Sequence, residues 1–75
     1  MEDRIKNVMS AVFEIQVEQI KDDSSPETIG SWDSLKHMNL VVALEEEFGI
    51  TFDDQEIYEM LNYTLILNII RDYLE

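Results

Sequence analysis

Residues 32–49 of the chain read WDSLKHMNLVVALEEEFG, and this stretch decides the fold. When its residues are placed about 100° apart, as in an α-helix, one face is apolar throughout. That face consists of Leu40, Val41, Leu44 and Phe48. Gly49 follows as a stop signal, because glycine readily adopts the left-handed conformation that ends many helices. We therefore expect a helix over residues 34–48 that packs through this face, with Ser34 in the N-cap position.

The same helix carries a second apolar face that a bundle does not require, because one buried stripe is enough for packing. Its members are Leu35, Met38 and Val42, and we call them the recognition strip. The polar residues around it are Lys36, Asn39, Glu45 and Glu46. Either the preceding loop or the third helix covers this strip, or it stays exposed for partners. We expect the exposed form, because an apolar centre with a polar rim is typical of transient interfaces.

The segments on either side predict three further helices. Apolar residues at helical spacing indicate a first helix over residues 2–19, and turn residues then mark a long loop over 21–33, pinned by Ile29 and Trp32. Asp53 and Glu56 form a capping signal for a short helix over 55–61. Thr64 is the expected N-cap of a last helix over 65–74. The predicted fold is all-α, a small four-helix bundle with three longer helices and one short helix, forming a single domain over residues 1–75.

Composition excludes several classes of function. Seventeen acidic residues face five basic ones, which gives a net charge of −12 and argues against binding nucleic acid or anionic membranes. The chain contains no cysteine, so it has neither disulfides nor thiolate metal sites. Its start lacks a signal-peptide pattern, and no run approaches the roughly 20 apolar residues of a membrane span. We expect a cytoplasmic protein that does not insert into membranes and whose partners carry basic patches.

Two groups of residues could suggest chemistry of their own. Ser34 and His37 lie one helical turn apart, which could pair a nucleophile with a base. Nothing orients the imidazole or builds an oxyanion hole, so we predict no catalytic residue and interpret His37 as a cap on the core stripe. The acidic runs at 45–47 and 53–54 lack the alternating ligands of a calcium loop, so we predict a solvated acidic face and no metal site.

The run WDSL at 32–35, followed by Met38, Leu40 and VALEEEFGI at 42–50, resembles the signature of acyl carrier proteins. The resemblance implies that Ser34, within the motif formed with Asp33 and Leu35, accepts 4′-phosphopantetheine from coenzyme A. The arm then carries acyl groups as thioesters, in a monomer that meets a phosphopantetheinyl transferase and enzymes of acyl loading and transfer. It also implies an acyl pocket lined by Val41, Leu44 and Ile57.

The absence of cysteine agrees with such a role. A chain without thiols cannot hold a thioester by itself, so the sulfur must arrive on a prosthetic group.

Three positions depart from the fatty-acid members of that family. Lys36 and Asn39 stand where those members usually have acidic residues, and Trp32 is bulkier than the usual residue before Asp-Ser. We therefore expect a carrier for a specialised pathway (polyketide-like, lipid or surface-glycan acylation) rather than housekeeping fatty-acid synthesis. The alternatives are an aminoacyl or peptidyl carrier protein, and an unmodified helical protein-interaction module.

Overall fold

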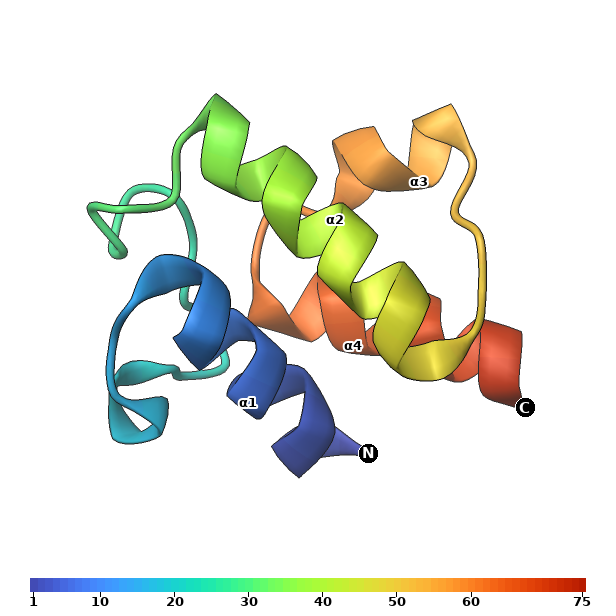
Figure 1. Ribbon diagram of the computed structural model, residues 1–75, viewed down its shortest axis with the longest axis horizontal. Helices are drawn as coiled ribbons and strands as arrows, with labels where there is room; N and C mark the ends of the chain where they lie inside the picture. Colours follow the sequence, from blue (N-terminus) through green and yellow to red (C-terminus); the bar gives the residue numbers. More distant parts are fainter.

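Four α-helices build the protein, and the computed structural model describes all 75 residues. They are α1 (Glu2–Phe13), α2 (Ser34–Phe48), α3 (Asp54–Glu59) and α4 (Tyr63–Leu74), with a 3₁₀-helix η1 (Val17–Gln19) after α1. Figure 1 shows α2 crossing the molecule diagonally, with the long loop at its N-terminal end and the short α3 beside it. The predicted all-α bundle of three longer helices and one short helix is confirmed. None of the helices combines the length and the apolar content of a membrane span.

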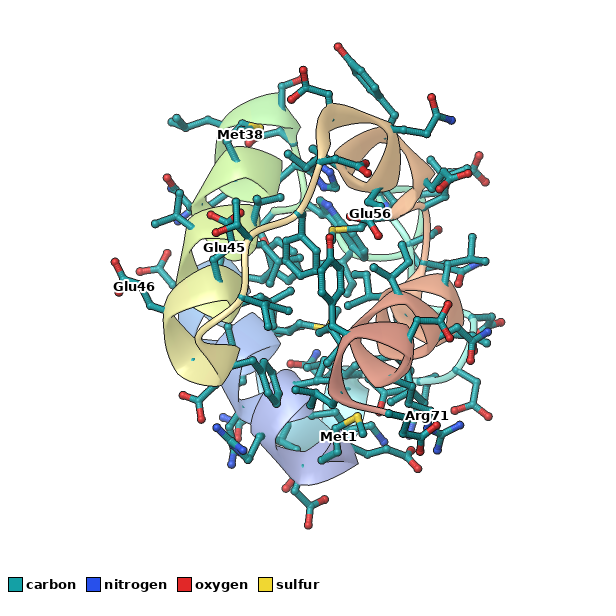
Figure 2. The ribbon with its side chains drawn as sticks, turned by 90° about the vertical axis from the view of Figure 1, so that its right-hand side faces the viewer. Met1, Met38, Glu45, Glu46, Glu56 and Arg71 are labelled. Carbon is teal, nitrogen blue, oxygen red and sulfur yellow. The ribbon has the colours of Figure 1, made fainter.

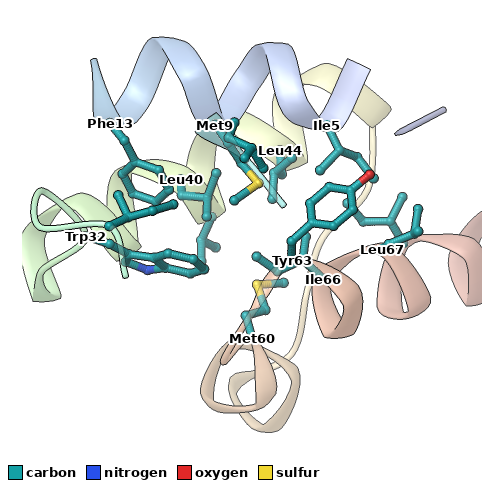
Figure 3. Close-up of a cluster of buried hydrophobic side chains, with 14 of the residues drawn as sticks. Ile5, Met9, Phe13, Trp32, Leu40, Leu44, Met60, Tyr63, Ile66 and Leu67 are labelled. Atoms are coloured by element: carbon teal, nitrogen blue, oxygen red, sulfur yellow. The ribbon is translucent and has the colours of Figure 1, made fainter. Parts of the chain in front are cut away.

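The core collects side chains from three helices and from the long loop. The predicted face of α2 is confirmed, since Leu40, Val41 and Leu44 are buried and Phe48 is partly buried. Figure 3 shows the aromatic and aliphatic side chains interleaving between the helices. The residues that α1 and α4 contribute are Ile5, Met9, Phe13, Tyr63, Ile66, Leu67 and Ile70.

The loop before α2 is held to the bundle as expected. Ile29 and Trp32 are both buried, and the Trp32 ring stacks on Phe13 with centroids 4.9 Å apart. The start of α4 also holds this loop, because the Tyr63 backbone N–H donates to the Ser24 carbonyl at 2.9 Å. The loop is therefore a packed segment that fixes the place where α2 begins.

The first helix ends at Phe13 and not at Gln19, which corrects the sequence expectation. Glu14 adopts the left-handed conformation with φ 58° and ψ 45°. The Ser10 carbonyl accepts from the backbone N–H groups of both Glu14 and Ile15, the pattern that also closes α2 at Gly49. The helical spacing of apolar residues continues past Phe13 because Ile15 still packs against the core after the chain has turned. The predicted helix was therefore too long.

Of the two helix caps predicted for α3 and α4, the first is confirmed and the second is wrong. The capping box of α3 is confirmed, with Asp53 Oδ1 accepting from the Glu56 N–H at 2.8 Å and Glu56 Oε1 from the Asp53 N–H at 3.0 Å. The prediction of Thr64 as N-cap of α4 is wrong, because Asn62 Oδ1 accepts from the Leu65 N–H at 2.9 Å. The Thr64 hydroxyl instead donates to the Asp22 carbonyl at 2.8 Å, so it fastens the long loop.

Two tyrosines fasten α4 to its neighbours. The Tyr63 hydroxyl donates to Glu2 Oε1 at 3.2 Å, and burial together with the Glu2 carboxylate raises the pKa of Tyr63 to about 12. The Tyr73 hydroxyl donates to Glu56 Oε1, and this hydrogen bond raises the pKa of Tyr73 to about 12. Both phenols therefore remain neutral donors well above neutral pH, and α4 stays tied to α1 and α3.

Replacing Glu14 by glycine should raise the free energy of unfolding by about 1 kcal/mol. A left-handed conformation costs an L-residue about 1–2 kcal/mol, and the larger entropy of glycine in the unfolded chain offsets only part of that gain. Glu14→Gln removes the same charge but keeps the Cβ atom, so it should stay within about 0.5 kcal/mol of wild type. Urea unfolding followed by circular dichroism measures both. Equal stabilisation by the two variants would assign the effect to charge and contradict the backbone explanation.

Candidate functional site

Ser34 is the first residue inside α2 and not its N-cap, which corrects the sequence expectation. Asp33 takes the cap, because its extended backbone lets Oδ1 accept from the Lys36 N–H at 2.9 Å. The Ser34 side chain is exposed, and its hydroxyl makes no hydrogen bond to the rest of the chain. The carboxylate thus does the capping, and the hydroxyl is left available for chemistry.

His37 joins three parts of the fold and does not contact the serine hydroxyl. Its Nδ1 accepts from the indole N–H of Trp32 at 3.0 Å. Because an indole only donates, the ring proton lies on Nε2, which donates to the Ile57 carbonyl at 3.0 Å. Both ring nitrogens are therefore engaged in linking the long loop, α2 and α3, and neither is directed at Ser34.

A groove of about 500 Å³ opens beside Ser34, between the start of α2 and α3. It is lined by Pro26, Trp32, Asp33, Ser34, His37, Met38, Ile57, Tyr58, Met60 and Leu61. Of the three residues predicted for an acyl pocket, only Ile57 lines this groove. Val41 and Leu44 are buried in the core, so their contact with an acyl group stays a prediction.

The recognition strip is exposed, as expected. Leu35 is 70% exposed, Met38 48% and Val42 50%, so neither the loop nor α3 covers the strip. Tyr58 and Leu61 continue the apolar surface onto α3 and its end, where they are 77% and 60% exposed. The sequence offers no clear signal for this extension, because α3 is too short to display a periodic stripe.

The polar residues around the strip differ in what they do. Asn39 and Glu46 are exposed, and Lys36 Nζ lies 3.9 Å from Glu14 Oε2. Glu45 is partly buried, and its Oε2 accepts from the Phe52 N–H at 2.9 Å, so it anchors the segment between α2 and α3. Figure 2 shows Glu46 pointing away from the body of the protein and Glu45 lying against that segment. Of these two carboxylates, only Glu46 is exposed.

Most of the few cations are used within the fold. Arg4 Nε pairs with Glu47 Oε2 at 2.8 Å, Arg71 lies 3.6 Å from Glu2, and the Lys6 ammonium lies 5.1 Å from the Tyr63 ring centre. Little positive charge is left to offset the acidic surface, which therefore favours a basic partner. No three His, Asp or Glu side chains come together as metal ligands.

Comparisons with known proteins agree on one family. A family profile described as "Phosphopantetheine attachment site" matches residues 3–63, which include all of α1 but its first residue, all of α2 and α3, and the whole lining of the groove. The acyl carrier protein of Nitratidesulfovibrio vulgaris (strain DP4) is 32% identical over 62 residues, covering 81% of this chain and 80% of that protein. That of Buchnera aphidicola subsp. Schizaphis graminum (strain Sg) is 39% identical over 56 residues, covering 75% and 71%. The protein of subsp. Acyrthosiphon pisum (strain 5A) is 40% identical over 57 residues, covering 75% and 70%.

Substitutions at 33 and 34 should separate the cap from the neighbouring hydroxyl. Asp33→Ala should lower the free energy of unfolding by about 1 kcal/mol, because it removes the acceptor for the Lys36 N–H. Asp33→Asn keeps an acceptor oxygen and should restore most of this loss. The free energy of unfolding of Ser34→Ala should stay within about 0.5 kcal/mol of wild type, because the serine hydroxyl makes no hydrogen bond to the rest of the chain. A larger loss for Ser34→Ala than for Asp33→Ala in urea unfolding would contradict the assignment.

Proposed function

Because the chain belongs to the acyl carrier protein family, whose members hold 4′-phosphopantetheine covalently, we propose that Ser34 is the attachment residue and that residues 1–75 act as one carrier domain. The observation that carries this proposal is the exposed, unbonded hydroxyl at the first position of α2. It lies between Asp33 and Leu35 in the Asp-Ser-Leu motif, within the matched residues.

The surroundings of Ser34 suit such a group. A phosphate on Ser34 would lie at the N-terminus of α2, where the helix dipole favours negative charge. The groove beside Ser34 offers apolar contacts from Met38, Ile57 and Leu61 to the rest of the arm. The group supplies the thiol on which an acyl cargo is held as a thioester.

The chain itself acts as a carrier and performs no catalysis in this proposal. Modification requires that the Ser34 hydroxyl lose its proton, and His37 is poorly placed to accept it because both its ring nitrogens are engaged. We therefore assign that base to the phosphopantetheinyl transferase. Partner enzymes with basic patches would meet the recognition strip and the exposed Glu46 carboxylate. The carrier would work as a cytoplasmic monomer.

The pathway served is inferred from the departures at Lys36 and Asn39. Lys36 places a cation in the first turn of α2, directly beside the strip, and Asn39 leaves a second rim position uncharged. An enzyme that reads carboxylates at these two positions would bind this surface less well. We propose a dedicated pathway, such as polyketide-like, lipid or surface-glycan acylation, rather than housekeeping fatty-acid synthesis.

Two alternatives remain distinct from this reading. An aminoacyl or peptidyl carrier would use the same arm, but the run of three glutamates at 45–47 favours an acyl carrier. A module that only binds proteins would use the exposed strip and never be modified. The second alternative differs from the proposal in a covalent product, so a mass measurement separates them.

Incubation with coenzyme A and a broad-specificity phosphopantetheinyl transferase should add one phosphopantetheine to the wild-type chain. The intact mass measures the product, and Ser34→Ala should show no gain because it lacks the accepting hydroxyl. Circular dichroism should show that Ser34→Ala is folded, so that its failure is chemical. An unchanged mass in the wild type would leave the interaction module as the better reading.

Lys36→Asp should improve acyl loading by enzymes of housekeeping fatty-acid synthesis and impair loading by the cognate enzyme. The variant restores an acidic residue beside the strip and also suits the helix N-terminus, so α2 should remain folded. Lys21→Asp makes the same charge change in the exposed loop and serves as the control. Loading is followed by intact mass under limiting enzyme. Equal responses of the two variants would reduce the effect to net charge and remove the argument for a dedicated partner.

A further inference from the structure

His37 and Trp32 are the only histidine and the only tryptophan of the chain, and they are hydrogen-bonded to each other. The indole N–H of Trp32 donates to His37 Nδ1 at 3.0 Å. Trp32 is buried, and its ring stacks on Phe13 with centroids 4.9 Å apart, as Figure 3 shows. The indole is therefore fixed in the core, and Nδ1 of the imidazole is the acceptor for its single donor.

This hydrogen bond requires a neutral imidazole. Nδ1 must offer a lone pair to the indole, so the ring proton stays on Nε2, which donates to the Ile57 carbonyl at 3.0 Å. A second proton would sit on Nδ1 and turn it into a donor. Two N–H groups would then face each other, and the buried indole N–H would lose its partner. Every buried side-chain nitrogen and oxygen of the fold has a hydrogen-bond partner, so protonation would create the first exception.

The charged groups around the imidazole allow a proton to reach it. His37 is partly exposed and lines the groove, whose other ionisable residues are Asp33 and Tyr58. The Asp33 carboxylate favours a positive charge nearby, and a phenol is uncharged where histidine titrates. Lys36, the preceding residue of α2, lies with Nζ 3.9 Å from Glu14 Oε2 of α1. The groove contains no Lys or Arg to oppose the proton, which a histidine ordinarily takes up near about pH 6.5.

The link between the two rings bears directly on Ser34. Trp32 lies two residues before Ser34, so its attachment to α2 fixes the end of the loop that presents the hydroxyl. Through Nε2 the same imidazole holds α3, which has no buried residue of its own. Tyr58 of α3 is exposed and continues the apolar surface that begins with the recognition strip. One neutral imidazole thus keeps the serine and both parts of this surface in a single arrangement.

We propose that neutral His37 is a positioning residue for the modification of Ser34, and that a proton on Nδ1 releases Trp32 and slows the reaction. This rests on Ser34 as the attachment residue. The reaction joins Ser34 Oγ to the phosphorus of phosphopantetheine and breaks the pyrophosphate bond of coenzyme A. The nucleotide leaves, and the serine proton passes to the base of the transferase. His37 takes no part in this chemistry and acts only through the positions of the loop and α3.

His37→Gln is the matched variant, because its amide can accept from the indole and donate to the Ile57 carbonyl but takes up no proton. Modification of the full chain with coenzyme A and a limiting amount of transferase is followed by intact mass. At about pH 8 His37→Gln should keep most of the wild-type rate, and at about pH 5.5 it should be faster than wild type by about fivefold. Comparing the two chains at one pH removes the transferase's own pH response. Equal rates at both pH values would overturn the proposal.

The single tryptophan reports the release directly. Between about pH 8 and about pH 5.5 the fluorescence of wild-type Trp32 should change in a step that His37→Gln lacks. Both chains carry the same carboxylates, so the difference between them isolates His37. In a Trp32→Phe background the two N–H groups cannot oppose each other, and exchanging His37 for Gln should no longer change the rate in acid. A persisting advantage of the glutamine in that background would contradict the role assigned to the indole.

If His37→Gln does not fold, NMR spectra of the wild type decide the proposal. The indole N–H signal of Trp32 should then move together with the imidazole signals as the pH falls, and an indole signal that stays fixed would overturn the proposal. Absence of any mass gain at every pH would instead refute Ser34 as the attachment residue. The fluorescence step does not depend on modification, so the two failures are distinguishable.

Discussion

The hydrogen bonds from Trp32 to His37 and from His37 to the Ile57 carbonyl hold together the parts of the molecule on which everything else depends. The long loop packs on the core through Ile29 and Trp32, whereas the short α3 beside the start of α2 has no buried residue of its own. A single imidazole joins them, since it accepts on one side and donates on the other. The position of Ser34 follows from this arrangement. The loop delivers it to the head of α2, and the groove opens between the two helices that the imidazole connects.

The start of α2 separates structural work from chemical work. Asp33 accepts the hydrogen bond that the helix end requires, so Ser34 contributes nothing to capping. A serine that also capped the helix would lose that interaction, or strain it, on modification. The cap of α2 therefore does not depend on the Ser34 hydroxyl.

The charges of the chain also fall into two groups, one paired within the fold and one left exposed. The few cations pair on the sides and ends of the bundle, as Arg4 does with Glu47 and Arg71 with Glu2. The recognition strip keeps its apolar residues exposed, beside carboxylates that no cation neutralises. A small bundle with so large a net negative charge would repel itself more strongly if those pairs were absent. The pairing thus supports the fold while leaving exposed carboxylates beside the apolar recognition strip.

Periodicity and end signals in the sequence determined the four helices and the buried face of α2, because these depend on neighbours within one or two turns. Whether the second face of α2 is covered depends on the long loop and on α3, and the structure shows this face exposed. The Asp-Ser-Leu motif pointed to Ser34 only through its resemblance to acyl carrier proteins. Predictions from neighbouring residues were wrong where a side chain makes its hydrogen bond to a residue far along the chain. Thr64 resembled a cap, but the Asp22 carbonyl uses its hydroxyl, and Glu14 ended α1 with no residue that marks a stop. Only the tertiary structure placed His37 between Trp32 and Ile57 and formed the groove with Tyr58 and Leu61. The contact between His37 and Ile57 joins residues 20 apart, and its geometry is set by packing that no short stretch of sequence specifies.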